Sequence, residues 1–137
     1  MAVAAGEADI AVANTYYLAL MLSGKKGAEQ QEAAKKVKAF FPNQNGRGTH
    51  MNVSCAALVK GAPNKDNAIK LIEFLASDKA QEIYAKQNHE YPIRQDIQIS
   101  DIVRSWGYPF KMDSMNLTEL GVLNDKAGMI FDKAKWK

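Results

Sequence analysis

The stretch Val12-Ala13-Asn14-Thr15-Tyr16-Tyr17-Leu18 places two adjacent phenols directly after a short run of small apolar residues. Ile10–Ala13 in this region predicts a short buried strand. Asn14 or Thr15 is typical of the residue that caps the N-terminus of a helix, so a helix is expected from Tyr16 to about Ser23. A strand that leads directly into a helix indicates an α/β fold.

The two adjacent tyrosines raise a functional question, because neighbouring side chains on a helix point about 100° apart and cannot both enter one core. In the first turn of a helix, both hydroxyls can converge on a cleft beyond the helix end. A bound trivalent cation holds a phenol ionised at neutral pH, and phenolate is a hard oxygen ligand that suits Fe³⁺. On the dipeptide alone, one buried tyrosine and one on the surface is the more common arrangement.

The rest of the chain alternates further helices with one more strand. Met51–Lys60 predicts a strand with small residues at its centre, and Ser77 is expected to cap a helix that begins at Asp78. The predicted helices are Ala28–Phe40, Asn64–Ala76, Asp78 to about Asn88, and Asn124–Lys135. This alternation predicts the α/β class.

The composition excludes several functional classes. The 137 residues carry a net charge of +3, and the lysines are scattered without interleaved aromatic residues, which argues against nucleic-acid binding. No apolar run has membrane-spanning length, and the N-terminus lacks the pattern of a signal peptide. The single cysteine, Cys55, excludes an internal disulfide and is expected to be a small buried residue. His50 and His89 are isolated and are interpreted as structural or surface residues rather than ligands.

Several motifs together resemble one family over nearly the whole chain. They occur in that family's order and read Val3-Ala4-Ala5-Gly6-Glu7, Asn14-Thr15-Tyr16-Tyr17, Gly48-Thr49-His50-Met51-Asn52-Val53-Ser54, Ala76-Ser77-Asp78-Lys79-Ala80-Gln81, Glu90-Tyr91-Pro92 and Phe131-Asp132-Lys133-Ala134. The chain resembles the carboxy-terminal part of periplasmic ferric-ion-binding proteins, which are the iron(III) substrate-binding components of ABC transporters.

The resemblance implies a site and a function. Tyr16 and Tyr17 would be paired phenolate ligands of Fe³⁺, and Asn14 would help to hold a synergistic anion, carbonate or phosphate. The protein would be periplasmic, would deliver iron to an ABC transporter permease, and would not be an enzyme. No nucleophile–base pair or carboxylate dyad supports catalysis.

The resemblance also implies an organisation within a two-lobed, class II periplasmic-binding-protein fold. Residues 1–46 would belong to the second lobe, 47–97 to the first and 98–137 to the second again, so the chain is expected to be a fragment. Cys55 stands where the family usually has glycine. Segments taken from two lobes would leave apolar faces open, and a homo-oligomer of the fragment is therefore expected.

Two alternatives remain open at this stage. The chain could bind no metal and act only as a self-associating structural module. It could also bind a non-metal anion, which would require Asn14 but not two phenols.

Overall fold

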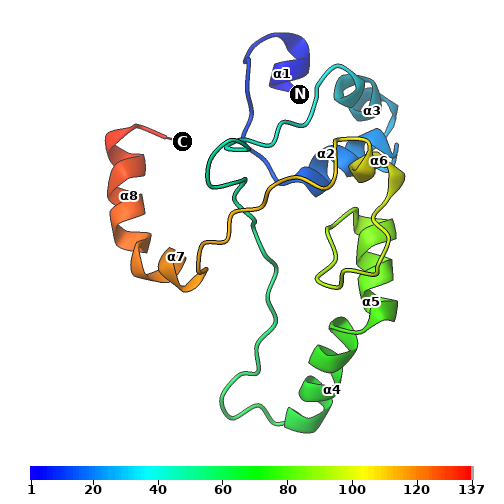
Figure 1. The fold of residues 1–137 in the computed structure, drawn as a ribbon, viewed down its shortest axis with the longest axis vertical. Coiled ribbons are helices and arrows are strands. Elements are labelled where there is room, and N and C mark those ends of the chain that lie inside the picture. Colours follow the sequence, from blue (N-terminus) through cyan, green and yellow to red (C-terminus); the bar gives the residue numbers. More distant parts are fainter. Residues whose placement is uncertain (137) are drawn as a thin grey trace.

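The computed structural model describes residues 1–136, and within them the regular structure is helical (Figure 1). The helices are α1 (Ala2–Ala5), α2 (Thr15–Leu22), α3 (Ala28–Lys35), α4 (Lys65–Leu75), α5 (Asp78–Ile83), the π-helical turn η1 (Tyr84–Asn88), α6 (Asp101–Arg104), α7 (Thr118–Val122) and α8 (Asn124–Lys133). In the part of the chain described here, no helix is long and apolar enough to cross a membrane.

A cluster of buried apolar side chains joins α2 to α6. Ala19 of α2 and Val103 of α6 are fully buried, and Ile99 completes the cluster. Three partly buried side chains pack around it, namely Tyr91, Ile102 and Trp106. This contact fixes α2, and with it the first turn that carries Tyr16 and Tyr17.

The helix predictions agree with the structure to within a few residues, with one exception. The helix predicted as Ala28–Phe40 ends at Lys35. Phe41 stacks on Phe110 with a centroid distance of 4.0 Å, and Pro42 disfavours helix in the residue before it. These two constraints hold Phe41 in a non-helical conformation, and Phe40 beside it is 83% exposed.

The two predicted strands are absent from residues 1–136, so the predicted α/β class is wrong for the described structure. Residues of Ile10–Ala13 and Met51–Lys60 belong to no strand, and Ile10 and Val59 are 84% and 74% exposed. A strand requires a second backbone segment for its hydrogen bonds, whereas a helix satisfies its own. Among the described residues, no such neighbour lies beside either segment.

Cys55 provides a second correction. It was expected to be a small buried residue, but its side chain is exposed. Every residue of the run Val53–Val59 is exposed, since the strand pairing that would cover it does not form.

Two connecting segments that are far apart in the sequence lie side by side at Thr49, a contact called the crossing below. Thr49 and Met112 form an isolated parallel bridge, in which the Thr49 amide donates to the Lys111 carbonyl at 2.9 Å. The Gln44 side chain joins both segments, donating to the Lys111 carbonyl at 3.0 Å and accepting from the Lys111 amide at 2.8 Å. This crossing holds residues 42–49 against residues 110–113.

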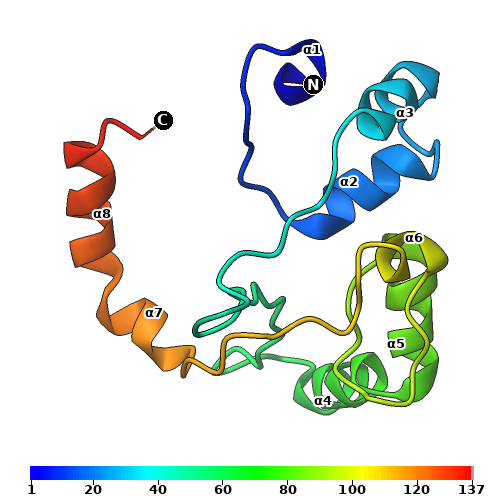
Figure 2. The same ribbon diagram turned by 45° about the horizontal axis from the view of Figure 1, so that its top comes forward.

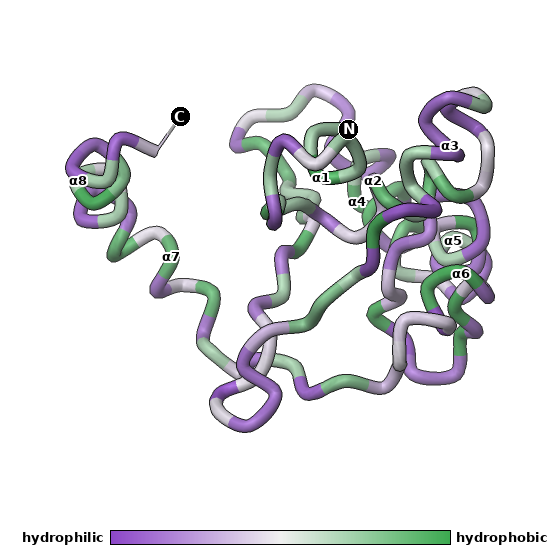
Figure 3. The backbone as a smooth tube through the Cα atoms, turned by 90° about the horizontal axis from the view of Figure 1, so that it is seen from above, coloured by the Kyte–Doolittle hydropathy of each residue, from purple (hydrophilic) through white to green (hydrophobic). Residues whose placement is uncertain are grey.

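Helices α7 and α8 form an arm that stands apart from the other helices (Figure 2). Apolar residues are present along this arm (Figure 3). Met129, Ile130 and Phe131 are 65%, 57% and 52% exposed. These apolar side chains of α8 are therefore uncovered in the described structure.

Candidate functional site

The candidate site is built on the first turn of α2. Asn14 occupies the N-cap position with an extended backbone (φ −72°, ψ 140°), but its side chain makes no capping hydrogen bond. The prediction that a helix begins here is confirmed, whereas the prediction of a side-chain cap is not. The Asn14 amide is consequently available for other partners.

Tyr16 and Tyr17 lie close together. Their ring centroids are 4.3 Å apart and the rings are inclined by 46°. Tyr16 lies three residues before the buried Ala19, on the same side of α2, and is half-buried. Tyr17 is 53% exposed. One phenol is therefore anchored against the protein while its neighbour faces solvent beside it.

Two hydrogen bonds connect Asn52, Asn14 and Tyr16. The Asn14 Nδ2 donates to the Tyr16 hydroxyl oxygen at 3.3 Å, and the Asn14 Oδ1 accepts from Asn52 Nδ2 at 2.9 Å. Asn52 and Asn14 are 38 residues apart in sequence. The structure thus brings the two predicted ligands and the predicted anion-binding residue together, and it adds Asn52.

The two phenols influence each other. The pKa of Tyr17 is raised above its ordinary value, first by its hydrogen bond with the Tyr16 hydroxyl, then by the charge of Tyr16 and by desolvation. Both phenolates close together would repel one another in the absence of a cation. A cation placed between the oxygens removes that repulsion and favours ionisation of both.

The hydroxyl oxygens of Tyr16 and Tyr17 are the candidate metal donors of this site. Among the described residues, no group of three or more His, Cys, Asp or Glu side chains could hold a metal ion. His50 is exposed, and the ring of His89 is buried with its Nδ1 2.9 Å from Ser100 Oγ. Neither imidazole belongs to the tyrosine pair's hydrogen-bond chain.

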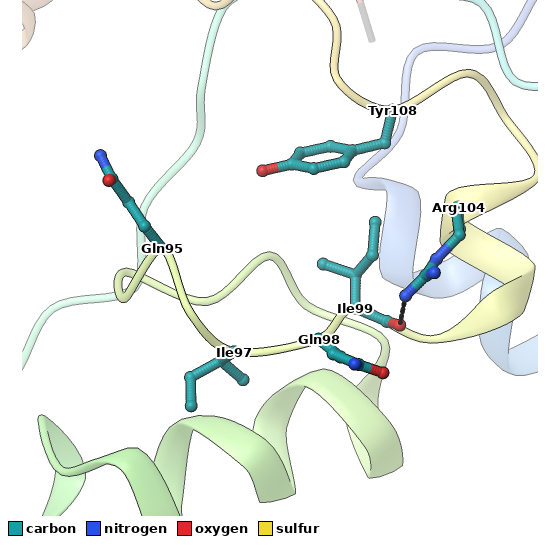
Figure 4. A pocket seen from close by; sticks show the side chains of 6 residues that line it. All are labelled: Gln95, Ile97, Gln98, Ile99, Arg104 and Tyr108. Atoms are coloured by element: carbon teal, nitrogen blue, oxygen red, sulfur yellow. Dashed lines mark hydrogen bonds between the residues drawn. The ribbon is translucent and has the colours of Figure 1, made fainter.

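A separate cavity of about 290 Å³ lies near α6 (Figure 4). Its lining residues are Gln95, Ile97, Gln98, Ile99, Arg104 and Tyr108. Arg104 Nη2 lies 3.5 Å from the Ile99 carbonyl oxygen, at the limit of a hydrogen bond. Tyr16 and Tyr17 do not line this cavity, so it is distinct from the phenol site.

The chain is similar to solved structures of iron-binding proteins. The Trichodesmium protein FutA, solved in complex with iron and citrate ligands, is 48% identical with a TM-score of 0.89, and the match covers 99% of this chain and 42% of that one. The ferric binding protein from Campylobacter jejuni is 38% identical with a TM-score of 0.89, covering 96% of this chain and 41% of that one. The described backbone therefore follows part of a ferric-binding periplasmic protein, although the two predicted strands do not form.

A curated relative gives the same result. Iron uptake protein A1 of Synechocystis is 46% identical over 136 residues, which are 99% of this chain and 37% of that protein. The chain thus spans about two fifths of the length of the relatives it matches. The resemblance to ferric-ion-binding proteins is confirmed.

Residues 1–109 match the family of bacterial extracellular solute-binding proteins. Because members of this family bind solutes rather than transform them, the match confirms the prediction that the protein is not an enzyme. The chain belongs to the bacterial extracellular solute-binding protein family.

Proposed function

We propose that this chain binds ferric ion through the phenolates of Tyr16 and Tyr17 and that it serves iron delivery to an ABC transporter permease in the periplasm. The observation that carries the proposal is the 4.3 Å separation of the two rings at the first turn of α2. Phenolate is a hard, anionic oxygen ligand, and a small trivalent cation such as Fe³⁺ prefers ligands of this kind.

A synergistic anion would complete the coordination. Asn14 stands at the N-terminus of α2, where unpaired backbone amides and the helix dipole favour negative charge. Carbonate and phosphate are the anions expected from the sequence. The relative solved with iron and citrate adds a carboxylate anion to the candidates. Asn14 would contact the anion while it donates to Tyr16.

The proposed organisation assigns residues 1–46 and 98–137 to a second lobe and residues 47–97 to a first lobe. Thr49 of the bridge to Met112 lies close to the first proposed change of lobe, between residues 46 and 47, and under this division the bridge joins a first-lobe segment to a second-lobe segment. The matches cover about two fifths of each relative's length, which supports the proposal that this chain is one part of a two-lobed protein.

A ferric titration followed by visible absorbance tests the proposal. Iron is added with bicarbonate or phosphate, and the expected result is a phenolate-to-iron charge-transfer band. The double variant Tyr16→Phe/Tyr17→Phe should lose the band, whereas Tyr108→Phe, a matched change at a tyrosine that is 42% exposed, should keep it. A band that survives in the double variant would refute the assignment.

A second candidate function, a self-associating module without metal, is favoured by the uncovered apolar side chains. Leu71 and Phe74 of α4 are 56% and 44% exposed, and Phe131 of α8 is 52% exposed. Apolar surface on several elements favours association between copies. A chain that remains colourless after ferric loading but whose mass rises with concentration would support this candidate over the first.

A further inference from the structure

We propose that Asn52 is a positioning residue of the ferric site, because its side chain fixes the orientation of the Asn14 amide toward Tyr16. This inference rests on the proposed function for its consequence on iron, but its structural part concerns the chain without metal. Asn52 lies in the extended segment that follows the crossing at Thr49.

The two hydrogen bonds of Asn14 determine which way its amide faces. An asparagine side chain has one acceptor oxygen and one donor nitrogen, and their positions can be exchanged by rotation. The donor Asn52 Nδ2 lies 2.9 Å from Asn14 Oδ1, so the oxygen is turned toward Asn52. The nitrogen must then face Tyr16, where it lies 3.3 Å from the hydroxyl oxygen.

This orientation matters because the amide donates to the atom that would bind iron. A donor directed at a phenolate oxygen stabilises its negative charge. In the opposite orientation, the Asn14 oxygen would face the phenolate oxygen, and two acceptors would repel each other. Asn52 therefore selects the favourable one of two orientations without touching Tyr16.

The position of Asn52 is set by the crossing. Three residues earlier, Thr49 is held by the bond from its amide to the Lys111 carbonyl and by the bond that its carbonyl accepts from the Asp113 amide, at 2.9 and 2.8 Å. The hydrogen bond from Asn52 to Asn14 thus joins the segment after the crossing to the first turn of α2. Under the proposed organisation, it links segments of two different lobes.

The metal-free arm of the test follows the Asn14 side-chain amide by ¹H–¹⁵N NMR. Asn52→Leu removes the donor at similar size, Asn52→Gln retains a donor, and Asn45→Leu is the control at an exposed loop asparagine. The reference is Tyr16→Phe, in which the Asn14 amide has no hydroxyl to donate to. We expect the Asn14 amide resonances of Asn52→Leu to move toward their positions in Tyr16→Phe, and those of Asn52→Gln and Asn45→Leu to stay near wild type. Unchanged Asn14 resonances in Asn52→Leu would overturn the proposal whether or not iron binds.

The ferric arm tests the consequence. Loss of a donor to phenolate raises the energy of its electrons, so the charge-transfer band of Asn52→Leu should move to longer wavelength. Its ferric affinity should fall about five- to tenfold, as for one lost hydrogen bond, with recovery in Asn52→Gln. An unshifted band in a folded, iron-loaded Asn52→Leu would overturn the proposal. Absence of any band in wild type would instead refute the proposed function and leave the NMR arm to decide the role of Asn52.

Discussion

Thr49 and Met112 form a parallel bridge in which the backbone of Thr49 donates to the Lys111 carbonyl and accepts from the Asp113 amide, at 2.9 and 2.8 Å. An ion pair between Arg47 and Asp113 lies beside the bridge, with Arg47 Nε and Asp113 Oδ2 3.0 Å apart. The Arg47 N–H is not directed at Asp113 Oδ2 well enough to form a hydrogen bond. The close approach of the two segments depends on the residue before Thr49.

Gly48→Ala should disrupt this crossing. A Cβ at Gly48 would lie 2.6 Å from the Met112 carbonyl carbon, and the backbone φ of +99° is in the left-handed region that favours glycine. Overpacking and backbone strain each cost roughly 1–3 kcal/mol, so we expect a loss of at least about 2 kcal/mol. Urea unfolding measures the loss.

Gly46→Ala is the matched control for that experiment. A Cβ at Gly46 would meet only the Asn43 carbonyl oxygen, at an ordinary 3.8 Å. Its stability should change by less than about 0.5 kcal/mol. Equal effects of the two substitutions would contradict the steric explanation.

Tyr91→Phe should not destabilise the protein and is expected to stabilise it slightly. The Tyr91 hydroxyl is buried without a hydrogen-bond partner, and burial together with the neighbouring Tyr108 raises the pKa of this phenol to about 12. Removing an unsatisfied buried polar group recovers part of its desolvation cost, up to about 1 kcal/mol. A large loss of stability in Tyr91→Phe would show that the hydroxyl has a partner.

The same phenol gives an alkaline pH dependence. Because the folded-state pKa lies above the ordinary value of 10.0, the folded protein retains the proton longer, and this contribution to stability is lost as pH rises from 10 toward 12. Between pH 10 and pH 12 the unfolding free energy of wild type should therefore fall further below that of Tyr91→Phe. A constant difference would argue against the raised pKa.

Protonation of His89 in acid should lower the free energy of unfolding. Burial first, and then the charge of Lys25, lowers the pKa of this imidazole below 6.5. The unfolded chain then binds a proton more readily than the folded one, so the contribution is present above pH 6.5 and is lost as pH falls toward the folded-state pKa. The urea midpoint should fall between about pH 7 and pH 5.

His89→Asn tests this assignment, because asparagine tolerates the left-handed backbone (φ 60°) at this position. The variant should show a smaller fall in midpoint over the same pH interval, whereas His50→Asn, at an exposed position, should behave as wild type. An equal pH dependence in wild type and His89→Asn would place the responsible group elsewhere.

The sequence predicted helices better than strands for a physical reason. The predicted start of the last helix at Asn124 and the predicted cap at Ser77, whose Oγ accepts from the Ala80 amide, are confirmed, because both depend on neighbours within a few residues. The strand predictions at Ile10–Ala13 and Met51–Lys60 failed because strands need remote partners. Asn52 escaped prediction for the same reason, since its hydrogen bond to Asn14 spans 38 residues.

Iron bound by this chain should be readily removed by citrate. Two phenolates and one anion leave coordination positions to water, and the described residues offer no further cluster of donor side chains. We expect the charge-transfer absorbance of the iron-loaded chain to disappear during a citrate titration. Retention of colour against excess citrate would contradict this, and sedimentation of the coloured species would then show whether two chains share one ion.

The last prediction is that the chain associates in solution. The run that includes Val53 and Val59, 47% and 74% exposed, has no strand neighbour, and α4 exposes Leu71 and Phe74 at 56% and 44%. Unpaired extended backbone and apolar side chains both favour contact between copies. Light scattering at several concentrations should give a mass above the 15.1 kDa of one chain.

The double variant Leu71→Lys/Phe74→Lys should lower that mass, because lysine cannot be buried between copies without a partner. Asp66→Lys, on the same helix but at a polar exposed position, should not lower it. A wild-type mass near 15.1 kDa at every concentration, with one cooperative unfolding transition, would mean that these apolar faces are stable in water without a partner.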